Sequence, residues 1–288
     1  MSFVDTMIVK FYTEIPRKSA QEFVEDFKTY FKKLADDSTT KRKTSYLNSA
    51  QSYLSIFKKK LMLREPAVSQ QFINALKLDS KDTKQLLREK AQRVHNSSTH
   101  LVAMNGDQLI KDGRNFLLSE NKYENLIGLA IVTGRRCGEL LVSATFRPPA
   151  SKHSTHMKYW CRLNGLLKKR GKQCADIEVP FLAPLKLVLT TIVAVRRQFP
   201  CLNQEDANRK YARGIANNVK RLFPKIGKIH RFRNLYAALC FHYFNENNCS
   251  IARIASEYLG HESTSATVLT YLNSILRDVG SIDFVQIP

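Results

Sequence analysis

The 42 residues from His230 to Tyr271 constrain the fold and the chemistry of this 288-residue chain more than any other stretch. They contain, in order, His230 and Arg233, a Leu-Gly-His triplet that ends at His261, and then Tyr271. His230 and Arg233 are three residues apart, so one face of a helix would present an imidazole and a guanidinium together. Each feature alone is more often a basic helix start, a loop histidine or a core tyrosine. In this order they predict a phosphate clamp beside an oxygen nucleophile.

A second motif, with the sequence TGRRCGEL, occupies residues 133–140. Arg136 and Glu139 are three residues apart, and in a helix they would share a face on which the carboxylate can orient the guanidinium group. An arginine held in this way can bind two phosphate oxygens at once. An ordinary surface ion pair is the commoner meaning of this spacing when it occurs alone. The spacing selects Arg136 rather than Arg135 as the functional residue.

The chain is strongly basic, with 46 lysine and arginine residues against 25 aspartate and glutamate residues and a net charge of +21. The basic residues are spread along the whole chain and do not form a tail. A basic body of this kind favours a polyanionic partner, because neutralising phosphates releases their counterions. The charge therefore favours nucleic acid over the alternative, a soluble basic protein with no such partner.

Several classes of protein are disfavoured by the same sequence. The six cysteines form no CxxC pair and no zinc-ligand pattern, so we expect reduced structural thiols, no metal and no cofactor. The longest apolar stretch, residues 181–195, is interrupted by Pro184 and Lys186, too soon for a membrane span. No signal peptide is recognisable. We expect a cytoplasmic protein, associated with a nucleoid or replicon, or in the host cytoplasm if phage-encoded.

The first 100 residues predict a helical, lysine-rich domain. Apolar residues recur at helical spacing over residues 19–34 and 41–63, and shorter helices are expected near 68–77 and 80–94. For any single lysine a solvated helix face is the simplest reading. Together they suit a clamp that faces DNA, in which we include Lys58, Lys59 and Lys60. Residues 96–99, with the sequence NSST, are the expected linker.

Residues 101–288 predict a second domain of mixed structure. Helices are expected from about 107 to 117 and from 123 to 133, with a helical continuation over 135–141 after Gly134, and strands over 141–146, 157–167 and 177–181, with a basic turn at 168–173. Further helices are expected over 185–199, 205–222, 231–246, 249–258 and 264–278, with a strand or arm at 282–287. The predicted fold class is mainly α with a small antiparallel β-sheet (α+β).

The order of these motifs resembles that of the tyrosine recombinases, the phage-integrase superfamily, over about residues 107–278. The N-terminal helices suit the core-binding domain of that superfamily. The chain is most similar to telomere resolvases, also called protelomerases. The segments that carry this similarity are residues 132–136, 208–223 and 232–238, together with residues 164–171, which resemble the lysine hairpin of those enzymes.

The resemblance implies a mechanism and a role for each residue. Tyr271 attacks the scissile phosphate and forms a 3′-phosphotyrosine, without metal or ATP. The implied helpers are the phosphate-binding residues Arg136 and Arg233, the histidines His230 and His261, and the general acid Lys168, with Lys169 and Lys172 as its alternatives. The basic hairpin residues Lys169, Arg170 and Lys172 are also expected to contact DNA.

The same active-site residues permit more than one outcome. A telomere resolvase joins each cut strand to the opposite strand of its own duplex, and the expected partners are a palindromic or inverted-repeat double-stranded DNA site and a second copy in a homodimer. A conventional integrase or recombinase exchanges strands between two duplexes as a tetramer. The third hypothesis is an inactive DNA-binding protein on the same fold. A type IB topoisomerase would relax supercoils without needing a specific site.

Overall fold

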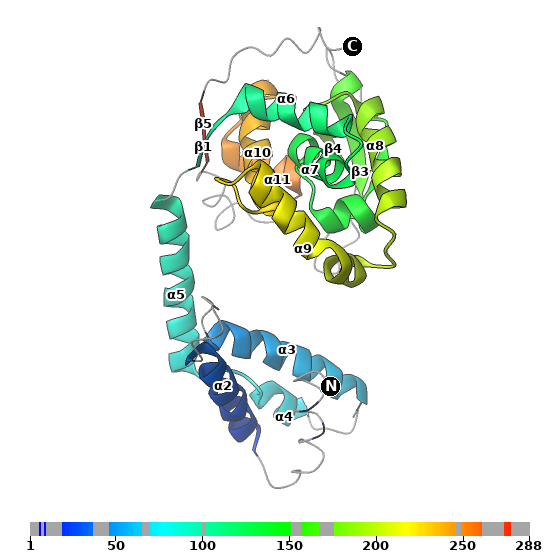
Figure 1. Cartoon of the computed structure of the whole chain (residues 1–288). Helices are drawn as coiled ribbons and strands as arrows, with labels where there is room; N and C mark the ends of the chain where they lie inside the picture. The colour runs from blue at the N-terminus through cyan, green and yellow to red at the C-terminus, as the bar shows by residue number, and fades with distance from the viewer. Residues whose placement is uncertain are drawn as a thin grey trace. The chain divides into compact units, whose positions relative to one another are not determined.

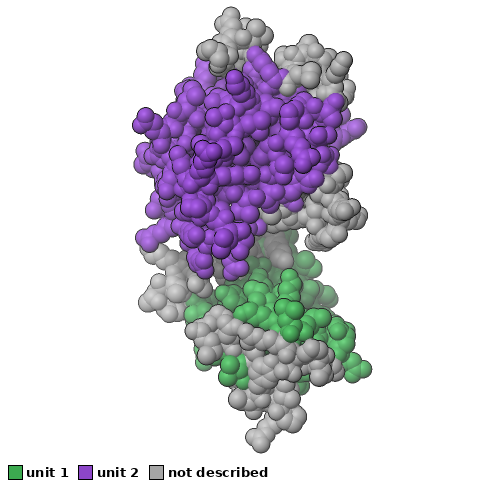
Figure 2. All heavy atoms as spheres, turned by 90° about the vertical axis from the view of Figure 1, so that its right-hand side faces the viewer, with its two compact units in different colours: residues 1–95 green, residues 96–288 purple. Residues whose placement is uncertain are grey.

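A computed structural model gives the fold of the chain (Figure 1). It describes residues 6, 9, 19–36, 46–64, 70–99, 102–150, 157–166, 176–245, 249–260 and 274–277. The chain divides into two compact units, residues 1–95 and 96–288, which Figure 2 colours separately. This division falls five residues before the expected boundary at residue 100. The role of the first unit as a DNA clamp stays a prediction.

The first unit is built from helices. They are α2 (Ala20–Asp36), α3 (Tyr46–Arg64), α4 (Gln70–Ala75) and α5 (Ser80–Thr99). Helix α2 packs against α3 and α4. Its phenylalanines recur every four residues on one buried face, and the rings of Phe27 and Phe57 lie 5.4 Å apart. Lys28 on α2 lies 2.6 Å from Asp82 on α5, which ties α5 to this core.

The expected helices of this unit are confirmed where the structure describes them. The two units divide immediately before the expected linker, residues 96–99, but these residues are helical. Helix α5 continues through residues 96–99 to its end at Thr99. Serine, asparagine and threonine are only modestly poorer helix formers than alanine. Because residues 80–99 contain neither glycine nor proline, nothing in the sequence forces the helix to stop earlier.

The second unit is organised around one buried helix, α7 (Lys122–Thr133). It packs against α6 (Gly106–Leu117), α8 (Leu185–Gln198), α9 (Gln204–Leu222) and α10 (Phe232–Tyr243), and Figure 1 shows it among them. All of its residues from Asn125 to Thr133 are buried. A helix that is apolar on every side belongs in a core, so the sequence dictates this central position.

A small antiparallel sheet covers part of this core. Its strands are β2 (Thr145–Arg147), β3 (Trp160–Asn164) and β4 (Ile177–Pro180), in the order β2-β3-β4. The predicted fold class, mainly α with a small antiparallel sheet, is confirmed. The tip of the β3–β4 hairpin, with the expected basic turn at 168–173, lies outside the described residues.

The segment before β2 differs from the expectation. Residues 139–143 form a short π-helix (η1, Glu139–Ser143), so the strand expected over 141–146 begins only at Thr145. The helix expected over 135–141 is also wrong at its start, since residues 135 and 136 are not helical. Arg196 on α8 fixes the end of this turn. Its Nε donates to the carbonyl of Leu140 at 2.8 Å, and its Nη2 donates to the carbonyl of Ala144 at 2.6 Å.

The C-terminal part contains a strand where a helix was expected. Residues 274–277 form β5 (Ser274–Arg277), which pairs in parallel with β1 (Val102–Asn105) and packs against α10. The helix expected over 264–278 is therefore wrong at its end, because pairing with a distant strand overrides local helical spacing. Residues 261–273 and the expected strand or arm at 282–287 lie outside the described residues. No helix in the described ranges is both long and apolar enough to cross a membrane.

Candidate active site

The candidate site begins where α7 ends. Gly134 closes this helix in the left-handed conformation, with φ of 63°. A side chain at this position would be strained by that φ, and its Cβ would collide with the ring of Tyr236. Only glycine meets both conditions, so the expected stop at Gly134 is confirmed. After this turn, the side chains of Arg135 and Arg136 lie in different surroundings: Arg135 is buried, and Arg136 is partly exposed.

Glu139 organises the side chains around it. Its carboxylate is completely buried, and its Oε1 accepts a hydrogen bond from Nη1 of Arg136 at 2.6 Å. Its Oε2 accepts one from the backbone N–H of Arg136 at 3.0 Å. The expected pairing of these two residues therefore forms. The pair was expected to form on one face of a helix. This expectation is wrong, because Arg136 precedes η1.

Arg233 meets the same carboxylate from the first turn of α10. Its Nη1 lies 3.7 Å from Oε2 of Glu139 and donates to the carbonyl of Gly134 at 2.7 Å. Its Nη2 donates to the carbonyl of Leu259 at 2.5 Å. Burial alone would raise the pKa of Glu139, but the charges of Arg135, Arg233 and Arg136 lower this pKa below its ordinary value. Glu139 is therefore an ionised carboxylate that holds several arginines together.

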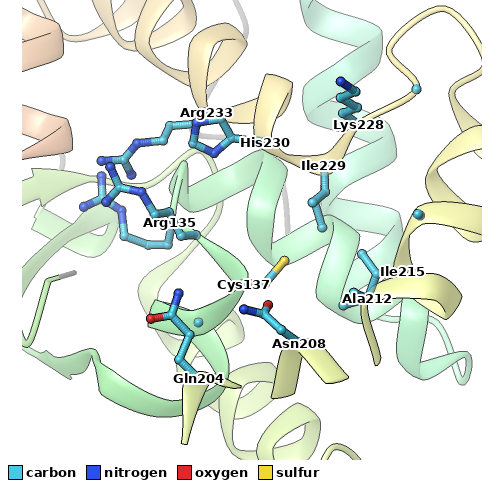
Figure 3. Close-up of a pocket in the computed structure, with 14 residues that line it drawn as sticks. Arg135, Cys137, Gln204, Asn208, Ala212, Ile215, Lys228, Ile229, His230 and Arg233 are labelled. Atoms are coloured by element: carbon cyan, nitrogen blue, oxygen red, sulfur yellow. The ribbon is translucent and has the colours of Figure 1, made fainter. Parts of the chain in front are cut away.

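Arg136, Arg233 and His230 line one cavity of about 510 Å³ (Figure 3). His230 lies on the short 3-10 turn η3 (Ile229–Arg231) that leads into α10, and it is exposed. The expectation that His230 and Arg233 share an α-helix face is wrong, because α10 begins only at Phe232. The turn still delivers both side chains to the same cavity, as the spacing predicted.

Another wall of the cavity comes from α9, which includes most of the segment 208–223 that resembles telomere resolvases, although no role at the site was predicted for its residues. Gln204, Asn208 and Ala212 line it, and Lys228, which also borders the cavity, directly precedes η3. In Figure 3 the two amide side chains lie at a distance from the arginine end of the pocket. The available signal was the four-residue spacing of 204, 208 and 212, which puts these positions on one helix face. Nothing in the sequence indicated that this face borders the arginines.

Other expected site residues lie outside the described residues. They are Tyr271, His261, Lys168, Lys169, Arg170 and Lys172. The structure describes the chain on both sides of the first two. Helix α11 (Ile251–Leu259) ends at Gly260 with φ of 66°, immediately before His261, which confirms the expected glycine stop. Strand β5 begins three residues after Tyr271 and packs against α10, whose first turn carries Arg233.

Lys58, Lys59 and Lys60 all lie on α3, but in different environments. Lys59 is exposed, whereas Lys58 and Lys60 are partly buried. Burial, with a smaller contribution from nearby Lys77, lowers the pKa of Lys58. Consecutive helix residues point about 100° apart, so the three side chains leave α3 in different directions, and their predicted contact with DNA stays a prediction. Of the three, Lys59 has the most exposed side chain.

The model of the telomere resolvase ResT/TelK catalytic domain matches residues 100–273, so the chain belongs to that family. No curated protein matches the chain in sequence. As a member of this family, the protein is a DNA breaking and rejoining enzyme that forms hairpin telomeres.

Solved structures of protelomerases share the fold. Protelomerase TelA covalently complexed with substrate DNA has a TM-score of 0.75 at 20% identity, with 96% of this chain and 89% of that chain covered. A mutant of TelA complexed with a DNA hairpin product gives 0.74 at 19%, covering 95% and 88%. Protelomerase TelK complexed with substrate DNA gives 0.60 at 17%, covering 96% of this chain and 58% of that chain.

Proposed function

We propose that this enzyme cuts both strands of a palindromic DNA site through a 3′-phosphotyrosine at Tyr271 and rejoins each strand to its own complement. The observation that carries the proposal is the buried carboxylate of Glu139, which holds Arg136 and Arg233 beside one cavity. Two guanidinium groups fixed by one anion form a preorganised site for a phosphate. The telomere resolvase family match favours hairpin closure over exchange between two duplexes.

The first chemical step balances without a metal or ATP. The phenol oxygen of Tyr271 attacks phosphorus, and the bond from phosphorus to the 5′ oxygen breaks. A free phenol has a pKa of about 10, so nearby guanidinium groups are needed to favour the phenolate and stabilise the charged transition state. Lys168 protonates the leaving oxygen, with Lys169 and Lys172 as the alternatives. His230 and His261 bind the phosphate oxygens or take up the proton that the phenol of Tyr271 releases.

The second step reverses the first with a different hydroxyl group. The 5′-hydroxyl of the complementary strand attacks the phosphotyrosine, releases Tyr271 and restores a phosphodiester across the end of the duplex. Which hydroxyl attacks depends on the geometry of the bent DNA and of the protein dimer. We therefore include a homodimer on a palindromic or inverted-repeat site in the proposal. The place of action would be the cytoplasm, at the replicon that carries the site; cell fractionation that found the protein elsewhere would contradict this.

The products from a palindromic duplex test the proposal. Purified protein is incubated with a duplex from the source replicon, without metal or ATP, and the products are separated on a denaturing gel. The expected products fold back on themselves as hairpins, each with half the base pairs of a duplex cut at its centre and with the nucleotide length of one substrate strand. Joined products between two different duplexes would replace the proposal with conventional recombination. The absence of both cleavage and a covalent protein–DNA species would leave only DNA binding on this fold.

The exposed Lys59 tests the proposed DNA contact of the first unit. Substitution of Lys59 by glutamine is expected to reduce the slope of log affinity against log salt concentration by roughly one, because one fewer phosphate is neutralised. DNA affinity measured by fluorescence anisotropy between low and moderate salt provides the slope. Lys186, exposed on α8, is the matched control, and Lys186→Gln should leave the slope unchanged. Equal effects of both substitutions would mean that only net charge matters.

A further inference from the structure

Arg135 occupies a different environment from its neighbour Arg136. It is buried, with 2% of its surface exposed, although it also borders the cavity (Figure 3). Its Nε donates to the carbonyl of Thr133 at 3.0 Å, and its Nη2 donates to the carbonyl of Tyr258. Two donors of the guanidinium group are thus committed to backbone oxygens. Arg136, by contrast, bonds to the side chain of Glu139 and is partly exposed where it borders the cavity.

The bond to Tyr258 joins segments that are 123 residues apart. Tyr258 is the penultimate residue of α11, and Arg233 donates to the carbonyl of the last residue, Leu259. Helix ends leave their final carbonyls without partners inside the helix, and these carbonyls carry the negative end of the helix dipole. Here each of the last two carbonyls of α11 accepts a hydrogen bond from a buried arginine. Both arginines also surround Glu139.

His261, a predicted site residue, comes two residues after the end of α11. Gly260 caps α11 through its N–H, which donates to the carbonyl of Ser256, and His261 comes next in the chain. Displacement of Tyr258 and Leu259 would therefore displace the start of the segment that carries His261. The expected effect of such a displacement is large, because a shift of about 1 Å at a reacting group can reduce a rate by about 100-fold.

We propose that Arg135 is a positioning residue, which holds the end of α11 so that His261 meets the scissile phosphate. The inference rests on the function proposed above. Arg233 contributes to the same anchor while it also borders the phosphate site, so it cannot separate positioning from phosphate binding. Arg135 can, because its hydrogen bonds go to Thr133 and Tyr258, and its replacement by lysine keeps the positive charge that it places near Glu139.

A double-mutant cycle tests the proposal. Single-turnover cleavage and DNA affinity are measured for Arg135→Met alone and in a His261→Gln background. The single substitution is expected to slow cleavage by about 30-fold, with less than a twofold change in affinity, since misplacement affects the chemical step. In the His261→Gln background the same substitution should slow cleavage by less than about threefold, because the two residues act through one effect. A full 30-fold effect in that background would overturn the proposal.

Arg114 provides a matched control. It is another buried arginine, and its Nε donates at 2.7 Å to the carbonyl of Leu182, which lies between β4 and α8. Arg114→Met should destabilise the fold without coupling to His261→Gln. If Arg135→Met does not fold, Arg135→Lys replaces it, because lysine keeps the charge but cannot reach both Thr133 and Tyr258 through one group. Arg135→Lys should show the same dependence on His261 with a smaller loss.

A direct measurement of His261 makes the test independent of activity. The imidazole signal of His261 is assigned in the labelled protein by its loss in His261→Gln. It is expected to shift in Arg135→Lys and to stay in place in Arg114→Met. An unchanged His261 signal in Arg135→Lys would overturn the proposal even if cleavage slowed. Failure of the unmodified protein to cleave DNA would instead count against the proposed function, so the two failures are distinguishable.

Discussion

Substitution of Tyr271 by phenylalanine is expected to abolish the covalent protein–DNA species and all hairpin products. Phenylalanine keeps the ring and loses only the oxygen that attacks phosphorus, so cleavage should fall by at least about 10⁴-fold. DNA affinity should change by less than about twofold, because the proposed phosphate contacts come from arginines and lysines. The measurement is a denaturing gel of labelled DNA, on which a covalently attached protein retards the strand.

Another tyrosine supplies the control for this substitution. The hydroxyl of Tyr211, on α9, donates to the carbonyl of Pro200 at 3.0 Å and lies outside the cavity residues. Tyr211→Phe removes the same atom and should retain both the covalent species and the hairpins. A covalent species formed by Tyr271→Phe would identify a different nucleophile. Loss of activity in both variants together with a lowered melting temperature would point to damage of the fold.

Local sequence patterns predicted most of the helices and the fold class. The apolar run in α7 and the repeated phenylalanines of α2 each have one stable solution, a buried helix or a buried helix face. Such signals fail where a distant segment decides the structure. Strand β5 forms against β1, which lies more than 170 residues earlier, and the π-helix at Glu139–Ser143 is held by Arg196 from α8. Neither partner can be inferred from spacing.

In the candidate site, too, local spacing was predictive and distant contacts were not. The spacing of Arg136 and Glu139 predicted their pairing, although the pair forms in a turn and not along a helix. The role of Arg135 could not be predicted, because its partner carbonyl belongs to Tyr258 and no side-chain type encodes a bond to a distant backbone oxygen. A motif therefore identifies the residues that meet the substrate more readily than the residues that position them.

Glu139→Gln is expected to reduce both the stability and the activity of the enzyme. The carboxylate is fully buried and faces several guanidinium groups, and glutamine would leave these charges without an anion. Removal of one partner from a buried ion pair costs about 3–5 kcal/mol of unfolding free energy. Cleavage should fall by about 100-fold or more in protein that remains folded, because Arg136 and Arg233 lose the group that aligns them. Chemical denaturation and single-turnover cleavage provide the two measurements.

The pH dependence of stability separates the charge of Glu139 from its shape. The pKa of Glu139 is lower in the folded protein than in the unfolded chain, where it is about 4.3. Its ionised form therefore stabilises the fold at pH values above about 4.3, and this contribution is lost as the pH falls through the lower, folded-state pKa. The difference in unfolding free energy between the unmodified protein and Glu139→Gln should be largest near neutral pH and should shrink in acid.

Glu257 offers the comparison for this second substitution. It is exposed on α11 and lies 2.7 Å from Arg253, so Glu257→Gln removes a carboxylate from an ion pair that water already screens. This variant should retain stability, cleavage and the normal dependence on pH. A difference between Glu139→Gln and the unmodified protein that stayed constant from neutral pH into acid would show that Glu139 acts by packing. Its charge would then not be what holds Arg136 and Arg233 at the phosphate site.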